Sequence, residues 1–265
     1  MSVQAIRTGA AITALSLVTL VLAPLQLLAL KMGRQRAASR LPRLWHRSAA
    51  WLIGMRVRRC GTPATDRPLL LVANHQSWAD IIALGAALEL SFIAKAEVRT
   101  WPGFGHLARL QRTVFVEREA RVKTGRQADA IADRLHAGDA MVLFAEGTTS
   151  DGNGVLPFKS ALLGAAQAAL RRSGVETVLV QPVSIAFTHA HGMPLGRAFR
   201  PLAAWPGDVT LMPHLLAFVR EGAFDVEIRF GEPIVFGPQT SRKETAKACE
   251  AEVARLLARS LNGEP

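Results

Sequence analysis

The feature that most constrains the fold is an alternation of short apolar runs with longer amphipathic runs after residue 60. The apolar runs are strand-like and cover residues 69–73, 91–94, 113–117, 141–145, 177–185 and 224–230. The amphipathic runs are helix-like and cover residues 78–88, 103–110, 124–137, 159–172 and 242–261. This alternation predicts an α/β fold, with a mostly parallel central sheet flanked by helices.

The first 60 residues differ sharply in composition from the rest. They hold ten Lys and Arg and no Asp or Glu, whereas the remaining residues carry 22 basic and 21 acidic side chains. Residues 9–30 are uncharged and long enough to cross a hydrocarbon core of about 30 Å, or to lie in one leaflet if the chain bends at Pro24. We therefore divide the chain into a basic, membrane-associating helical segment, residues 1–60, and a second domain, residues 61–265.

The charges also predict an orientation. One basic residue precedes the apolar stretch and nine follow it, so the positive-inside rule places the rest of the chain on the cytoplasmic face of the inner membrane. Residues 41–55 have the mixed composition of an interfacial helix. A basic arm can also bind nucleic acid, but the apolar stretch before it favours an anionic bilayer surface. A cleaved signal peptide fits less well, because the stretch exceeds the usual apolar length of about 7 to 15 residues.

Cysteine and histidine spacing indicates no metal site. Cys60 and Cys249 are the only cysteines and lie far apart, which predicts neither a disulfide framework nor a zinc site. His189 and His191 have ligand-capable spacing, but no third ligand cluster accompanies them.

The strand-like run at residues 69–73 ends in a polar turn that carries a base and a carboxylate, His75 and Asp80. Because His75 lies before the next helix and Asp80 in its first turn, the carboxylate can fold back onto the imidazole. Such a carboxylate fixes the tautomer of a general-base histidine and stabilises the imidazolium that forms. Taken alone, the pair is equally compatible with an ordinary strand-to-helix turn.

Further motifs decide between these interpretations. Asn74-His75 followed by Asp80 resembles the first motif of the glycerolipid acyltransferase family, which includes the lysophosphatidate acyltransferases. The second block runs from Lys95 to Arg118, the third is Leu143-Phe-Ala-Glu-Gly-Thr148, and the fourth covers residues 180–183. Four motifs in the family's order are far more specific than any one of them.

The resemblance implies an acyltransferase domain over residues 61–265. Such an enzyme moves a fatty acyl group from acyl-CoA or acyl carrier protein to the free hydroxyl of a membrane lysolipid, without a cofactor or an acyl-enzyme. His75 and Asp80 would then be catalytic. The implied substrate-binding positions are Asn74, Lys95, Arg112, Glu146, Gly147, Thr148, Thr149 and Lys159.

The loops after two strands predict where the chemistry takes place. His75 and Glu146 each follow a strand, so we expect both loops to open onto one crevice at the carboxyl ends of a parallel sheet. Glycine at position 147 allows a substrate to approach the backbone, and the N–H groups of Gly147 and Thr148 are candidates to hold an anionic oxygen.

The third motif departs from the family's pattern at Thr149. That position is usually an arginine thought to meet the acceptor phosphate. Candidate replacements are Lys95, Arg112, Arg118 and Lys159. Residues 146–152 and 191–197 are together similar to the branch that acylates lyso-ornithine lipid, a phosphate-free lipid.

Two acceptors therefore remain open. Lysophosphatidate (1-acylglycerol 3-phosphate) and lyso-ornithine lipid are near-equal candidates, with a slight preference for the first as the broader family function. The alternative of another class is a non-catalytic, membrane-surface lipid-binding protein.

Overall fold

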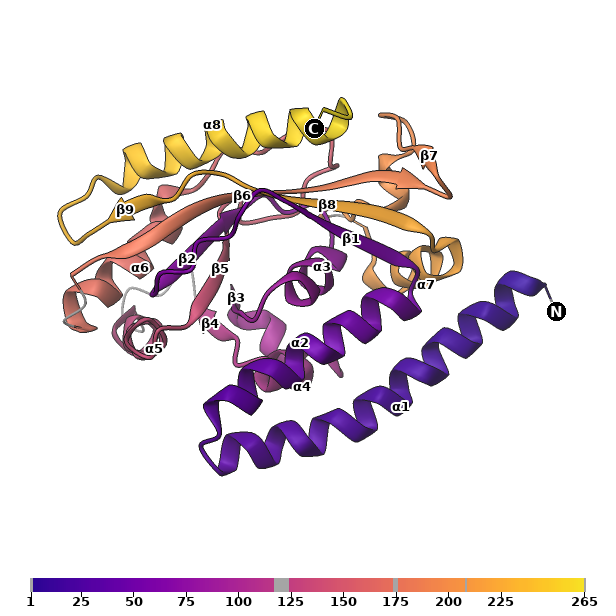
Figure 1. Cartoon of the computed structure of the whole chain (residues 1–265), viewed down its shortest axis with the longest axis horizontal. Helices are drawn as coiled ribbons and strands as arrows, with labels where there is room; N and C mark the ends of the chain where they lie inside the picture. The colour runs from indigo at the N-terminus through magenta and orange to yellow at the C-terminus, as the bar shows by residue number, and fades with distance from the viewer. Residues whose placement is uncertain (1, 117–123, 174–175, 208, 265) are drawn as a thin grey trace.

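The computed structural model describes residues 2–116, 124–173, 176–207 and 209–264. Its strands form one mixed sheet with helices on both faces (Figure 1). The strands are β1 (Met55–Cys60), β2 (Leu69–Ala73), β3 (Ser91–Lys95), β4 (Val114–Val116), β5 (Ala140–Phe144), β6 (Val178–Ala190), β7 (Met193–Pro194), β8 (Phe224–Phe230) and β9 (Ile234–Phe236). The predicted fold class is confirmed.

Eight α-helices and two 3₁₀ helices lie in the described ranges. The α-helices are α1 (Val3–Lys31), α2 (Gln35–Leu52), α3 (Ala79–Ala87), α4 (Phe104–Leu110), α5 (Thr124–His136), α6 (Ser160–Ser173), α7 (Leu211–Glu221) and α8 (Arg242–Leu261). The 3₁₀ helices are η1 (Ala96–Thr100) and η2 (Arg200–Leu202). Arg118 of the second motif lies outside the described residues.

The parallel part of the sheet determines where the loops meet. Strands β6, β2, β5, β3 and β4 lie side by side in that order and run in the same direction. Strand β8 is antiparallel to β6, and β1 is parallel to β8. The carboxyl ends of the five parallel strands therefore share one end of the sheet, where open α/β sheets bind ligands.

Strand side chains alternate between two apolar layers. In β2, Leu69 and Leu71 point into one layer and Leu70 and Val72 into the other, and each is at most 1% exposed. The first layer contains residues of α2, α3 and α7, and the second contains residues of α5, α6 and α8. Because β2 and β5 are buried on both faces, their sequences are continuous apolar runs and not alternating ones.

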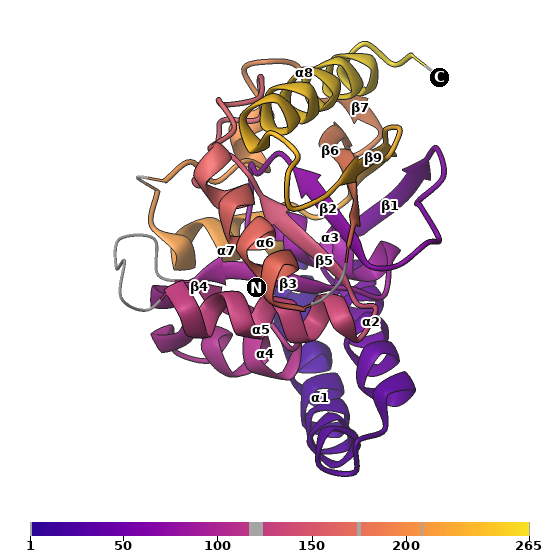
Figure 2. The ribbon, with the colours of Figure 1, turned by 90° about the vertical axis from the view of Figure 1, so that its left-hand side faces the viewer.

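Helices α1 and α2 form a hairpin that projects from the sheet on the side opposite α8 (Figures 1 and 2). Helix α2 packs on α3, where the ring of His46 lies against Gly85. Helix α1 continues through Pro24 for 29 residues, a length of about 44 Å. Its length and composition suit a membrane span. The N-terminal helix is therefore a candidate for membrane association.

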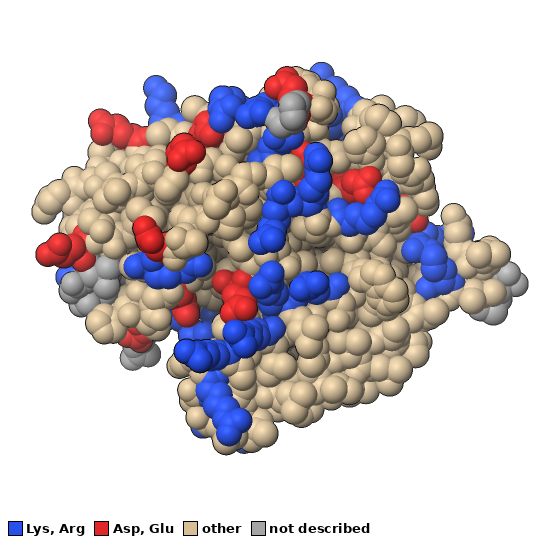
Figure 3. Space-filling view, in the orientation of Figure 1, with Lys and Arg blue, Asp and Glu red and all other residues tan. Residues whose placement is uncertain are grey.

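The surface of α1 is apolar and open. Leu17, Leu20 and Val21 are 59%, 70% and 62% exposed. Figure 3 shows this surface as an uncharged expanse, with Lys and Arg gathered near the turn between α1 and α2. Lys31, Arg34 and Arg36 have no acidic partner among the described residues.

Four of the basic residues expected near headgroups instead contact acids of the folded domain. Arg40 and Arg43 lie 3.9 Å and 3.8 Å from Glu89, and Arg56 lies 2.6 Å from Asp225. Arg58 pairs with Glu227. The excess positive charge that faces lipid is therefore smaller than the sequence count suggests.

Strand β1 lies inside the segment that the sequence assigns to the membrane arm. It pairs with β8 over its whole length, from Met55 opposite Phe224 to Cys60 opposite Arg229. The sheet thus begins six residues before the expected boundary after Cys60. Met55 is buried, whereas Arg56 and Arg58 are exposed, as expected for an edge strand with a solvent-exposed side.

Candidate active site

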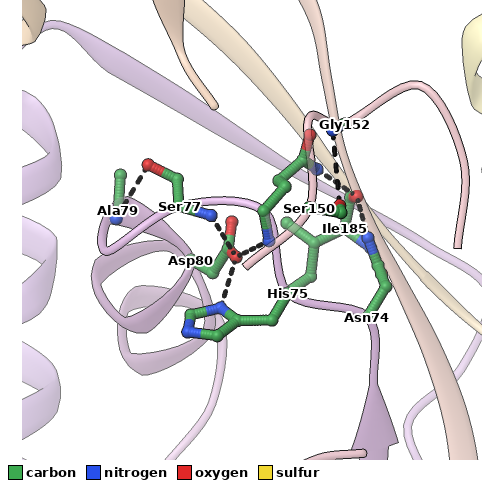
Figure 4. A network of polar contacts seen from close by, with 9 residues as sticks. Asn74, His75, Ser77, Ala79, Asp80, Ser150, Gly152 and Ile185 are labelled. Atoms are coloured by element: carbon green, nitrogen blue, oxygen red, sulfur yellow. Dashed lines mark hydrogen bonds and ion pairs between the residues drawn. The ribbon is translucent and has the colours of Figure 1, made fainter. Parts of the chain in front are cut away.

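His75 and Asp80 meet where β2 leads into α3. Nδ1 of His75 lies 2.8 Å from Oδ2 of Asp80 (Figure 4). The same oxygen accepts the backbone N–H groups of Gln76 at 2.8 Å and Ser77 at 2.9 Å. Asp80 is completely buried, so these three donors hold its carboxylate in one position. The prediction that Asp80 folds back onto His75 is confirmed.

The orientation of His75 leaves its outer nitrogen available. Because Nδ1 faces a carboxylate, it carries the proton and donates, and Nε2 keeps its lone pair. The imidazole stacks on Phe144, with ring centroids 3.9 Å apart and ring planes 17° apart. The His75 side chain is 17% exposed, so a substrate can reach it. An oriented imidazole with a free Nε2 is competent as a general base.

Asn74 and Gln76 lock the turn onto β6. Asn74 donates from Nδ2 to the carbonyl of Ile185 at 3.0 Å, and its Oδ1 accepts the Ile185 N–H at 2.8 Å. Gln76 donates from Nε2 to the same carbonyl at 2.6 Å. Both polar ends of Asn74 are used within the protein, so the structure favours a positioning role over the predicted contact with substrate.

Glu146 is a buried carboxyl group near the dyad. It is 1% exposed, and neither carboxyl oxygen has a hydrogen-bond partner in the described part of the chain. The pKa of Glu146 is raised to about 8, and burial is the largest cause. The backbone of His75 and Leu156 acts in the opposite direction, and the charges of Asp80 and Glu250 add to the rise. Glu146 is therefore mostly protonated at neutral pH and adds no second negative charge beside Asp80.

The turn after β5 differs from the prediction at Gly147. Its φ of +76° is a conformation that glycine tolerates, and its N–H donates to the carbonyl of Phe144 at 3.2 Å. The prediction that this N–H is available for an anionic oxygen is therefore wrong. Thr148, the next residue, is exposed, whereas Thr149 is only 9% exposed.

Residues 150–152 pack directly against the His75 turn (Figure 4). The N–H of Ser150 donates to the carbonyl of His75 at 2.8 Å. Gly152 has a φ of +77°, and a Cβ atom there would lie 2.3 Å from Oε1 of Gln76. Glycine is thus required at position 152, because the φ angle is positive and because there is no room for a Cβ atom. The loops after β2 and β5 form one unit at the carboxyl end of the sheet, as expected.

The predicted basic residues fall at opposite ends of the sheet. Lys95 is the last residue of β3, and Lys159 follows Phe158 with its N–H bonded to the carbonyl of Ala145, so both lie at the same end as His75 and are exposed. Arg112 instead precedes β4, and its guanidinium donates to Asp139 at 2.8 Å just before β5. The structure therefore does not bring Arg112 to His75.

Sequence reasoning named residues 191–197 only for their similarity to the lyso-ornithine lipid branch, and it missed the contacts that residues 195–207 make with the site. The N–H of Trp205 donates to the carbonyl of Gln76 at 2.6 Å. Nη1 of Arg200 donates to Oδ1 of Asn153 at 2.6 Å. This segment thus contacts both the His75 turn and the loop after β5. The signals in this segment were the similarity of residues 191–197 to that branch and a concentration of Arg, Trp and Pro.

The two histidines with ligand-capable spacing are used locally. Nδ1 of His189 lies 3.0 Å from Oγ1 of Thr188, and Nε2 of His191 lies 3.1 Å from a carboxyl oxygen of Glu221. Across residues 2–116, 124–173, 176–207 and 209–264, no group of three or more His, Cys, Asp or Glu side chains is placed to hold a metal ion.

Known proteins resemble this chain over nearly its whole length. The family called Acyltransferase matches residues 55–186. A lyso-ornithine lipid O-acyltransferase of Brucella abortus is 56% identical over 97% of this chain and 96% of that protein. One of Rhizobium meliloti is 48% identical over 94% of this chain and 85% of that protein.

The fold is also shared with a solved structure. The crystal structure of the 1-acyl-sn-glycerophosphate acyltransferase PlsC of Thermotoga maritima matches with a TM-score of 0.64 and 25% identity, over 97% of each chain. The match includes the N-terminal helices, because it leaves out only 3% of this chain. Together with the His75–Asp80 geometry, these similarities show that the chain belongs to the acyltransferase family.

Proposed function

We propose that this protein transfers a fatty acyl group from a thioester donor to the free hydroxyl of lyso-ornithine lipid. The donor is acyl-CoA or acyl carrier protein, and no cofactor takes part. The reaction takes place at the cytoplasmic face of the inner membrane. The observation that carries the reaction type is the oriented, partly exposed His75 with a buried carboxylate behind it.

The geometry supports a single-displacement mechanism. Nε2 of His75 takes the proton of the acceptor hydroxyl as that oxygen attacks the thioester carbonyl carbon. Asp80 stabilises the imidazolium that forms. When the tetrahedral intermediate collapses, the C–S bond breaks and the imidazolium returns its proton to the thiolate. The N–H of Thr148, an exposed residue, is the remaining candidate to hold the oxyanion, since the N–H of Gly147 is already engaged.

Two observations favour lyso-ornithine lipid as the acceptor. Thr149 stands where related enzymes have the arginine that meets phosphate, so the usual bidentate partner is absent. The whole-length relatives from Brucella abortus and Rhizobium meliloti act on lyso-ornithine lipid. The slight preference that the sequence alone gave to lysophosphatidate is therefore reversed.

Lysophosphatidate remains the second candidate for a specific reason. The solved relative from Thermotoga maritima acts on 1-acyl-sn-glycerophosphate and matches 97% of this chain. Lys95 and Lys159 are exposed at the catalytic end of the sheet, where either side chain has room to meet a phosphate.

The hairpin and the dyad lie on the same side of the sheet. His75 stacks on Phe144, which belongs to the apolar layer that α2 and α3 cover, and α1 packs on α2. A lipid held near α1 is therefore on the side of the sheet that carries His75. This placement supports acylation of a lipid that stays in the bilayer.

A competition assay tests the acceptor. Purified full-length protein in vesicles receives equal amounts of lyso-ornithine lipid and lysophosphatidate, with acyl carrier protein or CoA thioesters in separate reactions. We expect ornithine lipid as the main product. Phosphatidate as the main product would reject the proposed acceptor, and no acyl transfer to either lipid would support a non-catalytic lipid-binding protein.

A further inference from the structure

We propose that Arg200 and Asp151 form a headgroup subsite for a zwitterionic amino-acid lipid, with Arg200 binding its carboxylate and Asp151 its ammonium group. This inference rests on the proposed function and deepens it, because ornithine amide-linked through its α-nitrogen keeps one free carboxylate and one free amine. No sequence motif contributed Arg200.

The first observation is the incomplete pairing of Arg200. Its Nη1 donates to Oδ1 of Asn153, but its Nε is buried and without a partner among the described residues. An unpaired buried donor on a guanidinium costs free energy unless a ligand satisfies it. The Nε–H and the adjacent Nη2 group form the fork that binds a carboxylate through two parallel hydrogen bonds. Because Nε is buried, the Arg200 side chain must turn outward for a ligand to use this fork.

The second observation is the position of Asp151. Both of its carboxyl oxygens accept hydrogen bonds from Asn153, from the backbone N–H and from Nδ2, each at 2.9 Å. Asp151 is exposed, and each carboxyl oxygen keeps lone pairs for a further donor. The Asn153 bonds lower the pKa of Asp151, so the group is ionised at neutral pH. The side-chain amide of Asn153 therefore links Arg200 to Asp151, since it accepts from Arg200 and donates to Asp151.

Both groups adjoin the catalytic turn. Asp151 lies between Ser150, which bonds to the carbonyl of His75, and Gly152, which packs on Gln76. Arg200 lies in the segment that reaches Gln76 through Trp205. A headgroup held here lies beside the turn that carries His75.

The charges also discriminate between headgroups. A phosphate monoester carries up to two negative charges at neutral pH and would meet the ionised Asp151, which repels it, while the nearby Arg197 attracts it. A zwitterion offers one charge of each sign and is attracted by both residues. Thr149 leaves this balance unchanged because it is neutral, whereas an arginine there would favour an anion.

The test compares three acceptors with wild-type and variant full-length protein in vesicles. The acceptors are lyso-ornithine lipid, its methyl ester, which lacks the carboxylate charge, and its Nδ-acetyl derivative, which lacks the ammonium. Wild type should prefer the unmodified lipid over each derivative by at least about tenfold in kcat/KM. Arg200→Ala should abolish the preference over the ester and keep the preference over the acetyl derivative. Asp151→Asn should abolish the preference over the acetyl derivative and keep the preference over the ester.

Controls separate this pattern from a structural effect. Glu232→Gln, an exposed acid in the connection between β8 and β9, should leave both preferences unchanged. If Arg200→Ala is inactive, Arg200→Lys tests the role of the guanidinium, because lysine keeps the positive charge but cannot form two parallel hydrogen bonds. Arg200→Lys should reduce the preference for the unmodified lipid over the ester. If the ratios of kcat/KM for the unmodified lipid over each derivative stay at the wild-type value in both Arg200→Ala and Asp151→Asn, the proposed subsite is wrong. Acylation of lysophosphatidate but not of lyso-ornithine lipid by wild type is a different result, and it overturns the proposed function itself.

Discussion

Oδ2 of Asp80 holds the His75 imidazole at 2.8 Å while it also accepts two backbone N–H groups of the same turn. Asp80→Asn keeps an oxygen for those N–H groups and removes the charge behind the imidazole. We expect kcat to fall at least about a hundredfold with the fold retained. Steady-state kinetics and circular dichroism of the purified variant check this, and a near-normal kcat in a folded variant would contradict it.

The contact between Gly152 and Gln76 gives a second prediction. In Gly152→Ala, the new Cβ lies 2.3 Å from Oε1 of Gln76 and the residue keeps a φ of +77°, so the loop must move. Activity should fall by at least about tenfold, because Gln76 and Ser150 position His75 through the backbone. Gly154→Ala is the matched control, since nothing lies within 4 Å of a Cβ there, and it should retain activity. Equal activities in the two variants would show that the packing of Gly152 does not position the dyad.

The sequence predicted the parts of the fold that repeat a simple pattern. Strand β8 has the predicted bounds, and β2 ends at Ala73 as expected, because buried strands are continuous apolar runs with polar ends. Strand β1 was missed since Arg56 and Arg58 look like part of the basic arm. Their partners, Asp225 and Glu227, lie about 170 residues away, and only the register of β1 on β8 brings them together.

The active site was predictable where one local segment carries it. His75 and Asp80 lie five residues apart, in the turn before α3 and in its first turn, so the local chain alone brings them together. Arg112 was misplaced even though a signal was present, because a residue before a parallel strand lies at the end opposite to one that follows it. Arg200 was out of reach, since its contact with Asn153 depends on how residues 195–207 fold over the sheet.

The buried Glu146 predicts an unusual dependence of stability on pH. Its pKa is raised from 4.5 to about 8, so the folded protein binds a proton that the unfolded chain releases. The contribution of protonated Glu146 to the free energy of unfolding is therefore fully present below pH 4.5. It is lost as the pH rises through 8. The loss is at most roughly 5 kcal/mol. Glu146→Gln removes this dependence and should make the variant more stable than wild type at pH 8.5.

Thermal unfolding in detergent at pH 5.5 and pH 8.5 checks the prediction for Glu146. The decrease in Tm between the two conditions should be smaller in Glu146→Gln than in wild type. Glu97→Gln, at an exposed glutamate, should show the wild-type decrease. Identical decreases in all three proteins would mean that Glu146 is ionised in the folded state.

The exposed face of α1 predicts the membrane contact. Leu20→Glu places a charge where the side chain is 70% exposed on the apolar hairpin, and it should weaken vesicle binding by at least about tenfold. Val235→Glu is the matched control, because Val235 is 61% exposed on β9, on the other side of the molecule. Sedimentation with anionic vesicles measures both. Equal weakening by the two substitutions would place the membrane contact elsewhere.

The most direct test of the catalytic assignment is the turnover of His75→Ala with lyso-ornithine lipid and a thioester donor. His75→Ala leaves Asp80 bonded to the backbone of Gln76 and Ser77, so the turn should persist. Loss of the base at Nε2 should reduce kcat at least about a hundredfold, with vesicle binding unchanged. A folded, membrane-bound His75→Ala variant that acylates the lipid at a near-normal rate would contradict the account of this enzyme.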